Sequence, residues 1–536
     1  MANSGKVLGT LLVLWAVLAG VSALPGGFRF LTFETDMAHL ADILLRLEQG
    51  AQLHSDISTP LGAWGFAPFE VLMRAGVPMG HALIWGQALV GALLIPLLWW
   101  AGTSRLRTGG AIALGASALI IMAGLTYGRT DASVTFAMHY NRWSWALLLP
   151  VLVLVLLPPR SEDARHGWPP LIDGLVIGAA MFALAMIKAS SFMAFAPIVI
   201  LGLVLARNWR GLAVALGVGA LGLVWLVATR GVAFILAYAD ELLVVSRSQL
   251  RTAPGASLPE LLASPAHLPV TVLAIAALLT MRRVSPGSLP LLFVLLLGAY
   301  WATFQNYGND PLWLIPLGLL LWDTGARPIA GPIAGKWANV LRFEALAAAV
   351  IVAPVLFNFA LSPLRHLQTP PGGFVPLVLA APQHGDLQMP ASRVSERLLT
   401  RKYLEGKAAI EPSQFAGRTL ARCGVTGGLI TQVRAHVAEI DAAALGLTTQ
   451  PYVADLFSPH WMMVGWDPLD GSAPWYYGGL PGFKNATHLL VPDCPFMPKA
   501  REKALDLIES WIEGKQGRGV TEVLRGTDFT LYRVER

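Results

Sequence analysis

Charged residues are scarce in this chain of 536 residues. They make up 13% of the sequence, whereas soluble proteins carry roughly 25%. Apolar residues reach 55%, the mean hydropathy is +0.57, and the apolar residues occur in long uncharged runs. This composition excludes a soluble enzyme, a disordered scaffold and a small secreted domain held by disulfides. It predicts a polytopic membrane protein.

Several common signatures are also missing from the sequence. There is no Walker-type phosphate loop, so we do not expect ATP to drive the protein. Histidine and cysteine do not occur at metal-ligand spacing, and no basic run with interleaved aromatic residues accompanies the net charge of +6. Nucleic acid is therefore not an expected partner. The two cysteines, Cys423 and Cys494, lie in the hydrophilic tail, where an exported location would permit one disulfide.

Long apolar segments predict about eleven transmembrane helices. For the first segment a signal peptide is the competing interpretation, because Lys6 precedes an apolar core. Ser22-Ala23-Leu24 is a poor cleavage site, which favours a retained helix. The predicted spans are 7–24, 82–102, 109–126, 143–158, 171–188, 190–206, 211–229, 266–281, 287–303, 311–322 and 341–362.

The distribution of lysine and arginine predicts the orientation. If the N-terminus is inside, basic residues such as Arg105 and Arg282 gather in the inner loops, as the positive-inside rule requires. Eleven crossings then place the tail outside. We expect a mostly α-helical fold: a polytopic bundle over 1–362 in the cytoplasmic (inner) membrane, and an exported (periplasmic) α/β domain over 363–536. Within the tail, 498–514 reads as an amphipathic helix and 520–534 as two strands.

The first outer loop, residues 25–81, is long for a connector. It begins with an acidic cluster containing Glu34 and Asp36. A helical stretch over 37–49 carries apolar residues on one face, which is typical of a helix in the membrane interface. A loop with the pattern G-x-x-x-x-x-D-x-x-x-P-x-G follows over 50–62, and a second partly apolar stretch over 64–75 leads to the next span.

This order of features resembles the GT-C superfamily of membrane glycosyltransferases, which includes protein O-mannosyltransferases and aminoarabinose transferases. The resemblance covers the first seven or so helices and the first outer loop. It implies a GT-C type fold, a polyprenyl-phosphate-linked sugar donor, inversion at the anomeric carbon, and a carboxylate of the first loop as general base. By position, Asp36 matches that base, and Glu34 is the near alternative.

Each of two carboxylates in the first loop has both a functional and a structural explanation. A hydroxyl needs a positioned base to attack a sugar carbon, and partial burial would raise the pKa of Asp36. Alternatively, Asp36 caps a helix that starts at Met37. Asp56 either holds a substrate hydroxyl or forms an Asx turn before Pro60.

Candidate phosphate ligands lie on the same side of the membrane. Lys188 interrupts an apolar run, and a charge at that depth is by default functional, although it could also snorkel to the interface. Arg129 and Arg142 could hold a lipid phosphate through guanidinium donors, with interfacial anchoring as the alternative for Arg142. His139 and Tyr140 belong to the same polar segment.

Other outer segments are candidates for sugar binding or closure. Gln305 and Asn306 could bond sugar hydroxyls, or they could belong to a helix C-cap. The loop 230–265 includes a second interfacial helix over 233–246 and is either a mobile lid or an ordinary surface loop. Aromatic residues of the tail could stack on sugars or pack in a core: Trp461, Trp466, Trp475, Tyr476 and Tyr477.

The predicted function is therefore an inverting glycosyltransferase that moves a sugar from a polyprenyl-phosphate carrier to a hydroxyl of an envelope glycan, lipid or protein. No cofactor and no obligatory metal are expected, because a monophosphate donor lacks the diphosphate that a divalent cation neutralises, although Glu34 and Asp36 could together hold such a cation. A transporter or flippase of lipid-linked sugars is the alternative, although the sequence shows no repeat and its polar residues gather on one face. A non-catalytic envelope glycan assembly protein is the third possibility.

Overall fold

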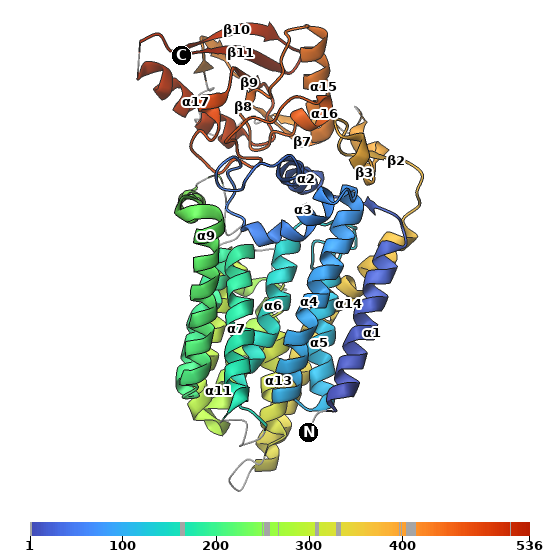
Figure 1. Cartoon of the computed structure of the whole chain (residues 1–536), viewed down its shortest axis with the longest axis vertical. Coiled ribbons are helices and arrows are strands. Elements are labelled where there is room, and N and C mark those ends of the chain that lie inside the picture. The colour runs from blue at the N-terminus through green and yellow to red at the C-terminus, as the bar shows by residue number, and fades with distance from the viewer. Residues whose placement is uncertain are drawn as a thin grey trace.

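The protein consists of a helical bundle and a strand-containing C-terminal region that covers one end of it (Figure 1). The N-terminus lies at the opposite end of the bundle (Figure 1). This computed structural model describes residues 3–160, 167–248, 250, 258–265, 267–305, 310–327, 334–395, 397, 399–403, 414–514 and 516–536.

A helix lies at each of the eleven predicted spans. Among the described residues, six helical segments are long and apolar enough to cross a membrane, and three shorter apolar helices accompany them. The chain is therefore an integral membrane protein. The helices are α1 (Ser4–Ala23), α4 (Met79–Arg105), α5 (Thr108–Ala123), α6 (His139–Leu156), α7 (Trp168–Ile187), α8 (Ala189–Leu205), α9 (Trp209–Arg247), α11 (Leu268–Val284), α12 (Leu289–Gln305), α13 (Leu314–Gly325) and α14 (Ala334–Gln368).

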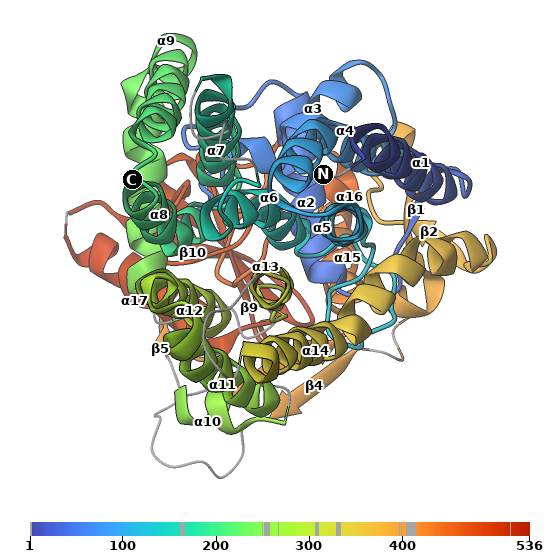
Figure 2. The same ribbon diagram turned by 90° about the horizontal axis from the view of Figure 1, so that it is seen from below.

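Small residues and one buried ion pair hold parts of the bundle together. A Cβ on Gly174 of α7 would lie 2.4 Å from the carbonyl oxygen of Gly211 in α9, so only glycine permits this approach, as is common between membrane helices. Arg105 and Asp173 form a buried ion pair of 2.5 Å at the end of the bundle that is far from the C-terminal region (Figure 1). Helix α6 lies in the middle of the bundle (Figure 2) and is buried along almost its whole length.

Two helices extend further than their predicted spans. Helix α9 continues to Arg247 after a break at Gly231, whose φ of 81° and ψ of 164° are not helical. The part beyond the break coincides with the predicted interfacial helix over 233–246. Helix α14 continues to Gln368, so the predicted domain boundary at residue 362 falls inside it.

Two helices of the first outer loop lie between the bundle and the C-terminal region (Figure 1): α2 (Glu34–Glu48) and α3 (Ala67–Arg74). The apolar face of α2 is buried, as the spacing predicts. Its polar face is used as well, because Asp42 pairs with Arg46 at 2.5 Å and accepts a hydrogen bond of 2.9 Å from Trp461 of the C-terminal region. Helix α2 therefore connects the two parts of the molecule.

The C-terminal region contains a four-stranded sheet in the order β10-β11-β9-β8. Strand β11 is antiparallel to β10 and β9, whereas β8 is parallel to β9. The helix and the two strands expected from the sequence are α17, β10 and β11. The elements are β8 (Tyr452–Val453), β9 (His488–Pro492), β10 (Gly519–Arg525), β11 (Phe529–Glu535), α15 (Leu429–Ala442) and α17 (Pro498–Glu513).

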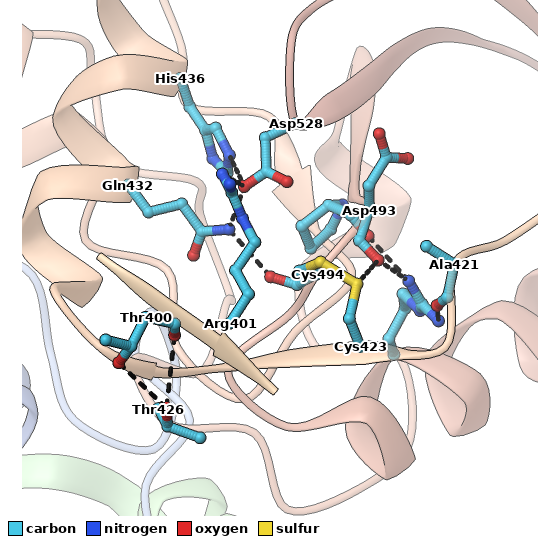
Figure 3. Close-up of a disulfide and its surroundings, with 12 residues drawn as sticks. Thr400, Arg401, Ala421, Cys423, Thr426, Gln432, His436, Asp493, Cys494 and Asp528 are labelled. Carbon is cyan, nitrogen blue, oxygen red and sulfur yellow. Dashed lines mark hydrogen bonds and ion pairs between the residues drawn. A yellow bond between two sulfur atoms is a disulfide. The ribbon is translucent and has the colours of Figure 1, made fainter. Parts of the chain in front are cut away.

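A disulfide between Cys423 and Cys494 joins β7 (Cys423–Gly427) to the segment after β9, with 4.9 Å between the two Cα atoms (Figure 3). Beside it, the Gln432 side chain donates hydrogen bonds to the Cys494 carbonyl oxygen at 2.8 Å and to the Asp528 carboxylate at 2.6 Å. The disulfide thus belongs to a polar network that fixes α15 against the sheet.

Candidate active site

A cavity of about 560 Å³ lies where the ends of the helices meet the C-terminal region. Its ionisable lining includes Asp36, His39 and Lys188. Its wall also has a large apolar part contributed by α8, α9, α12 and residue 250: Met193, Leu242, Val245, Leu250, Trp301 and Phe304. The cavity therefore combines a polar lining with an apolar one.

Asp36 reaches the cavity from the first turn of α2. The helix begins at Glu34, after Phe33 in the left-handed conformation (φ 63°). The Phe33 ring stacks on that of Tyr127, with 4.6 Å between the centroids and 7° between the planes. The expected helix start at Met37 was therefore three residues late, and Asp36 lies within the helix rather than at its N-cap.

The surroundings of Asp36 favour a basic carboxylate. Burial raises the pKa of Asp36 to about 6, against hydrogen bonds from its own backbone N–H and the Thr35 hydroxyl that lower it. Burial also raises the pKa of Tyr127, and the nearby Asp36 carboxylate raises it further. A carboxyl group with a pKa near 6 is ionised at neutral pH and is a stronger base than an exposed aspartate.

Glu34, the alternative base, lies in the same turn but has a different environment. Its carboxylate pairs with Arg393 of the C-terminal region at 3.4 Å, and it does not belong to the cavity lining. The geometry therefore separates the two carboxylates that the sequence left as alternatives.

Lys188 lies at the junction between α7 and α8, where its extended backbone (φ −152°, ψ 92°) ends one helix before the next begins. Its Nζ donates a hydrogen bond of 2.5 Å to the Asn141 side-chain oxygen and lies 5.9 Å from the centroid of the Tyr140 ring. Lys188 and Tyr140 both line the cavity. The ammonium group and the Asp36 carboxylate thus face one space, although they come from different helices.

The two candidate arginines are placed differently. The guanidinium of Arg142 is buried and donates to the carbonyl oxygens of Thr126 at 2.7 Å and Ala137 at 2.8 Å. Arg129 is exposed, and its backbone N–H donates to the Asp310 carboxylate at 3.0 Å. The cavity lining includes neither arginine, so the structure brings Lys188, but neither of them, together with Asp36.

Of the other predicted residues, Gln305 at the end of α12 lines the cavity. Asn306 lies outside the described residues. His139 is buried, its Nε2 lies 2.9 Å from the Gly65 carbonyl oxygen, and its ring packs against Phe69 at 5.4 Å. It therefore contributes to an aromatic core beside the cavity rather than to its lining.

Asp56 takes part in a turn. Its carboxylate accepts a hydrogen bond of 2.8 Å from the Gln52 N–H, and its carbonyl oxygen accepts one of 2.9 Å from the Gly471 N–H. It does not line the cavity. These contacts differ from the expected Asx turn, because the carboxylate bonds an N–H four residues earlier and the Ser58 N–H donates to Ser472 instead. They join the first outer loop to the C-terminal region.

Sequence reasoning missed His39 and did not single out Trp475, and both line the cavity. His39 had a usable signal, because it follows Asp36 by three residues and so lies on the same face of a helix. Trp475 had none, because nothing in the sequence distinguishes it from the other aromatic residues of the tail. Among the described residues, no group of three or more histidine, cysteine or acidic side chains could hold a metal ion.

Comparisons with known proteins give a structural likeness but no match in sequence. No family model matches the chain, and no curated protein matches it. Among solved structures, the chain is similar to the crystal structure of ArnT from Cupriavidus metallidurans bound to undecaprenyl phosphate. The two share 12% sequence identity with a TM-score of 0.41, and the match covers 99% of this chain and 98% of that chain.

Proposed function

We propose that the chain is an inverting membrane glycosyltransferase that moves a sugar from a polyprenyl-phosphate carrier to an acceptor hydroxyl at the outer face of the membrane. The observation that carries this proposal is the shared cavity of Asp36 and Lys188. It combines a carboxylate basic enough to take a proton from a hydroxyl with an ammonium group that can neutralise a phosphate.

The chemistry needs both groups at once. The Asp36 carboxylate accepts the hydroxyl proton while the acceptor oxygen attacks the anomeric carbon from the face opposite the phosphate. The bond between that carbon and the phosphate oxygen breaks, and the phosphate leaves with the electron pair. A fixed cation beside the leaving group stabilises this developing charge, and Lys188 is placed to supply it.

The apolar wall suits the carrier. Residues such as Leu242, Val245 and Trp301 extend the cavity lining away from the charged groups. An isoprenoid chain gains free energy from contact with such a surface. We therefore place the carrier tail along this wall and its phosphate at Lys188.

The proposed orientation puts the N-terminus in the cytoplasm and the C-terminal region on the exported side. The excess of basic residues in the loops at the N-terminal end supports it. The disulfide between Cys423 and Cys494 also supports it, since such bonds persist in oxidising compartments.

The placement of the ionisable groups favours a transferase over a transporter. Transporters bind their substrates near the middle of the membrane. Asp36 lies in α2, outside the spanning helices, and Lys188 lies at the end of α7. A transporter does not need a general base away from the middle of the membrane, where its substrate binds.

The direct test is transfer by the Asp36→Asn variant, purified in lipid nanodiscs with a panel of polyprenyl-phosphate sugars. We expect transfer to fall by a factor of about 10² to 10⁴, the usual contribution of a general base, while donor binding persists. Glu34→Gln is the matched control, because it removes a carboxylate of the same helical turn that lies off the cavity. Full transfer by Asp36→Asn would refute the mechanism.

A further inference from the structure

Only part of the aromatic cluster in the C-terminal region packs into a core. Trp461 and Trp466 are buried, and Trp461 donates its indole N–H to Asp42 of α2. Trp475 and Tyr477 are partly exposed and line the cavity that contains Asp36. The C-terminal region thus places aromatic surface in the candidate active site, although it lies far away in the sequence.

The backbone around Trp475 is held in place from two sides. Within the C-terminal region, Trp475 forms an antiparallel bridge with Phe457, and the next residue donates its N–H to the Leu456 carbonyl oxygen at 2.7 Å. From the bundle side, the Ser58 N–H donates to the Ser472 carbonyl oxygen at 3.1 Å. The loop over residues 50–62 therefore positions the segment that carries Trp475.

His39 lies beside this tryptophan. The centroids of the two rings are 5.6 Å apart, and the planes are tilted by 58°. His39 follows Asp36 by three residues on α2, so both side chains reach the same cavity. Its Nε2 is buried and has no hydrogen-bond partner in the part of the chain that the structure describes.

An unpaired buried nitrogen in a cavity wall points to a missing ligand. Leaving a buried polar atom unsatisfied costs free energy, so such an atom needs an explanation, and a ligand in the adjoining cavity supplies one for His39. Burial lowers the pKa of His39 to about 4, so the imidazole is neutral at pH 7. It then offers one donor and one acceptor, a combination that suits a hydroxyl group.

We infer, on the basis of the proposed transferase activity, that the acceptor is a saccharide whose ring packs on Trp475. One of its hydroxyl groups bonds His39, and a neighbouring hydroxyl group is the one that Asp36 deprotonates. A pyranose presents a face of C–H bonds, and an aromatic ring presents an electron-rich apolar face to it. A serine or threonine of a protein acceptor has no such face. The acceptor class is therefore a glycan or the headgroup of a glycolipid.

The inference can be tested without transfer. Full-length protein in nanodiscs is mixed with methyl pyranosides or with a capped serine peptide, and contact is read by saturation-transfer NMR. We expect at least one pyranoside to receive saturation on its ring C–H groups. Trp475→Ala should weaken this binding about tenfold, whereas Trp475→Phe should retain most of it.

Matched variants separate recognition from folding. Trp511→Ala removes a tryptophan of α17 that packs on Phe483 and Arg518 outside the cavity, and sugar binding should not change. If Trp475→Ala fails to fold, Trp475→Leu removes the aromatic face while it retains apolar volume. His39→Leu should weaken the pyranoside contact, and His39→Gln should restore part of it through its amide.

Three results would overturn the inference: no pyranoside contact in the wild type, equal contact in Trp475→Ala, or contact of the serine peptide alone. The last result would assign a protein acceptor. Failure of the transferase proposal is distinguishable, because it would appear as full transfer by Asp36→Asn while the sugar contact at Trp475 remained intact.

Discussion

Two polar regions lie side by side at the end of the bundle that the C-terminal region covers, and they differ in what their side chains bond. In the rim loop, defined as residues 124–138 together with the first turn of α6, Arg142 donates to two backbone carbonyl oxygens and His139 bonds the Gly65 carbonyl oxygen. In the cavity wall, defined as Asp36, His39 and Lys188, the side chains face a space large enough for a ligand. A charge at the membrane rim therefore indicates a binding site only if it also faces a cavity.

The largest expected effects distinguish Arg142, whose loss should destabilise the fold, from Lys188, whose loss should lower transfer. Arg142→Ala removes charge-assisted hydrogen bonds and leaves buried carbonyl oxygens without donors, which should cost about 3 kcal/mol or more of folding free energy. Lys188→Ala should fold, but it should lower transfer by about 100-fold through loss of a phosphate contact. Thermal unfolding in nanodiscs and transfer kinetics measure the two effects.

The contrast would fail if Arg142→Ala folded normally and lost donor affinity. Arg142→Lys serves as the matched control, because it keeps the charge but cannot reach both carbonyl oxygens as the planar guanidinium does.

A smaller effect concerns pH. Since the Asp36 carboxyl must be ionised to accept a proton and its pKa is raised to about 6, kcat/KM should fall about tenfold per pH unit below pH 6 and stay flat just above it. Burial also raises the pKa of Asp310 to about 6, and its carboxylate accepts the Arg129 N–H in the rim loop. An Asp310→Asn variant should therefore keep the inflection near pH 6, and loss of the inflection there would assign it to Asp310.

The smallest effect is on stability. The pKa of Asp36 is higher in the folded protein (about 6) than its ordinary value of 3.8, so ionisation disfavours folding. Stability should fall as pH rises from about 3.8 to 6 and remain lower above that. Asp36→Asn should therefore raise the free energy of unfolding at pH 7.5 by at most about 3 kcal/mol. This gain would appear as a higher unfolding temperature at pH 7.5 and little change below pH 4.

Asp42→Asn gives the opposite case within the same helix. It breaks a buried ion pair with Arg46 and should lower the unfolding temperature. If both variants lowered it, the proposal that the buried, ionised Asp36 carboxylate destabilises the fold would be wrong.

Hydropathy alone located the helices of the bundle, because a membrane helix must be apolar along its length. It could not locate the ends of α9 and α14, since both continue as more polar helix outside the predicted spans. The break at Lys188 was readable, because one charge interrupts an apolar run. That Lys188 meets Asp36 at one site was predicted from the place of both residues on the same side of the membrane, and both line one cavity.

The failures of prediction concern contacts made by loop backbone. The acceptors of Arg142 are carbonyl oxygens of the rim loop, and the course of that loop depends on left-handed residues such as Arg129 (φ 53°) and Met138 (φ 59°). Such conformations have no strong signal in non-glycine residues. The position of Trp475 beside His39 likewise depends on how the C-terminal region docks on α2, which local sequence does not encode.

The central claim is that Lys188 and Asp36 serve two ends of one reaction in one cavity. A density map of the protein in nanodiscs with a polyprenyl phosphate tests it most directly. We predict the phosphate within about 3 Å of the Lys188 Nζ, with the isoprenoid chain along Leu242, Val245 and Trp301. A phosphate bound at Arg129 and the rim loop, with the cavity empty, would contradict the account.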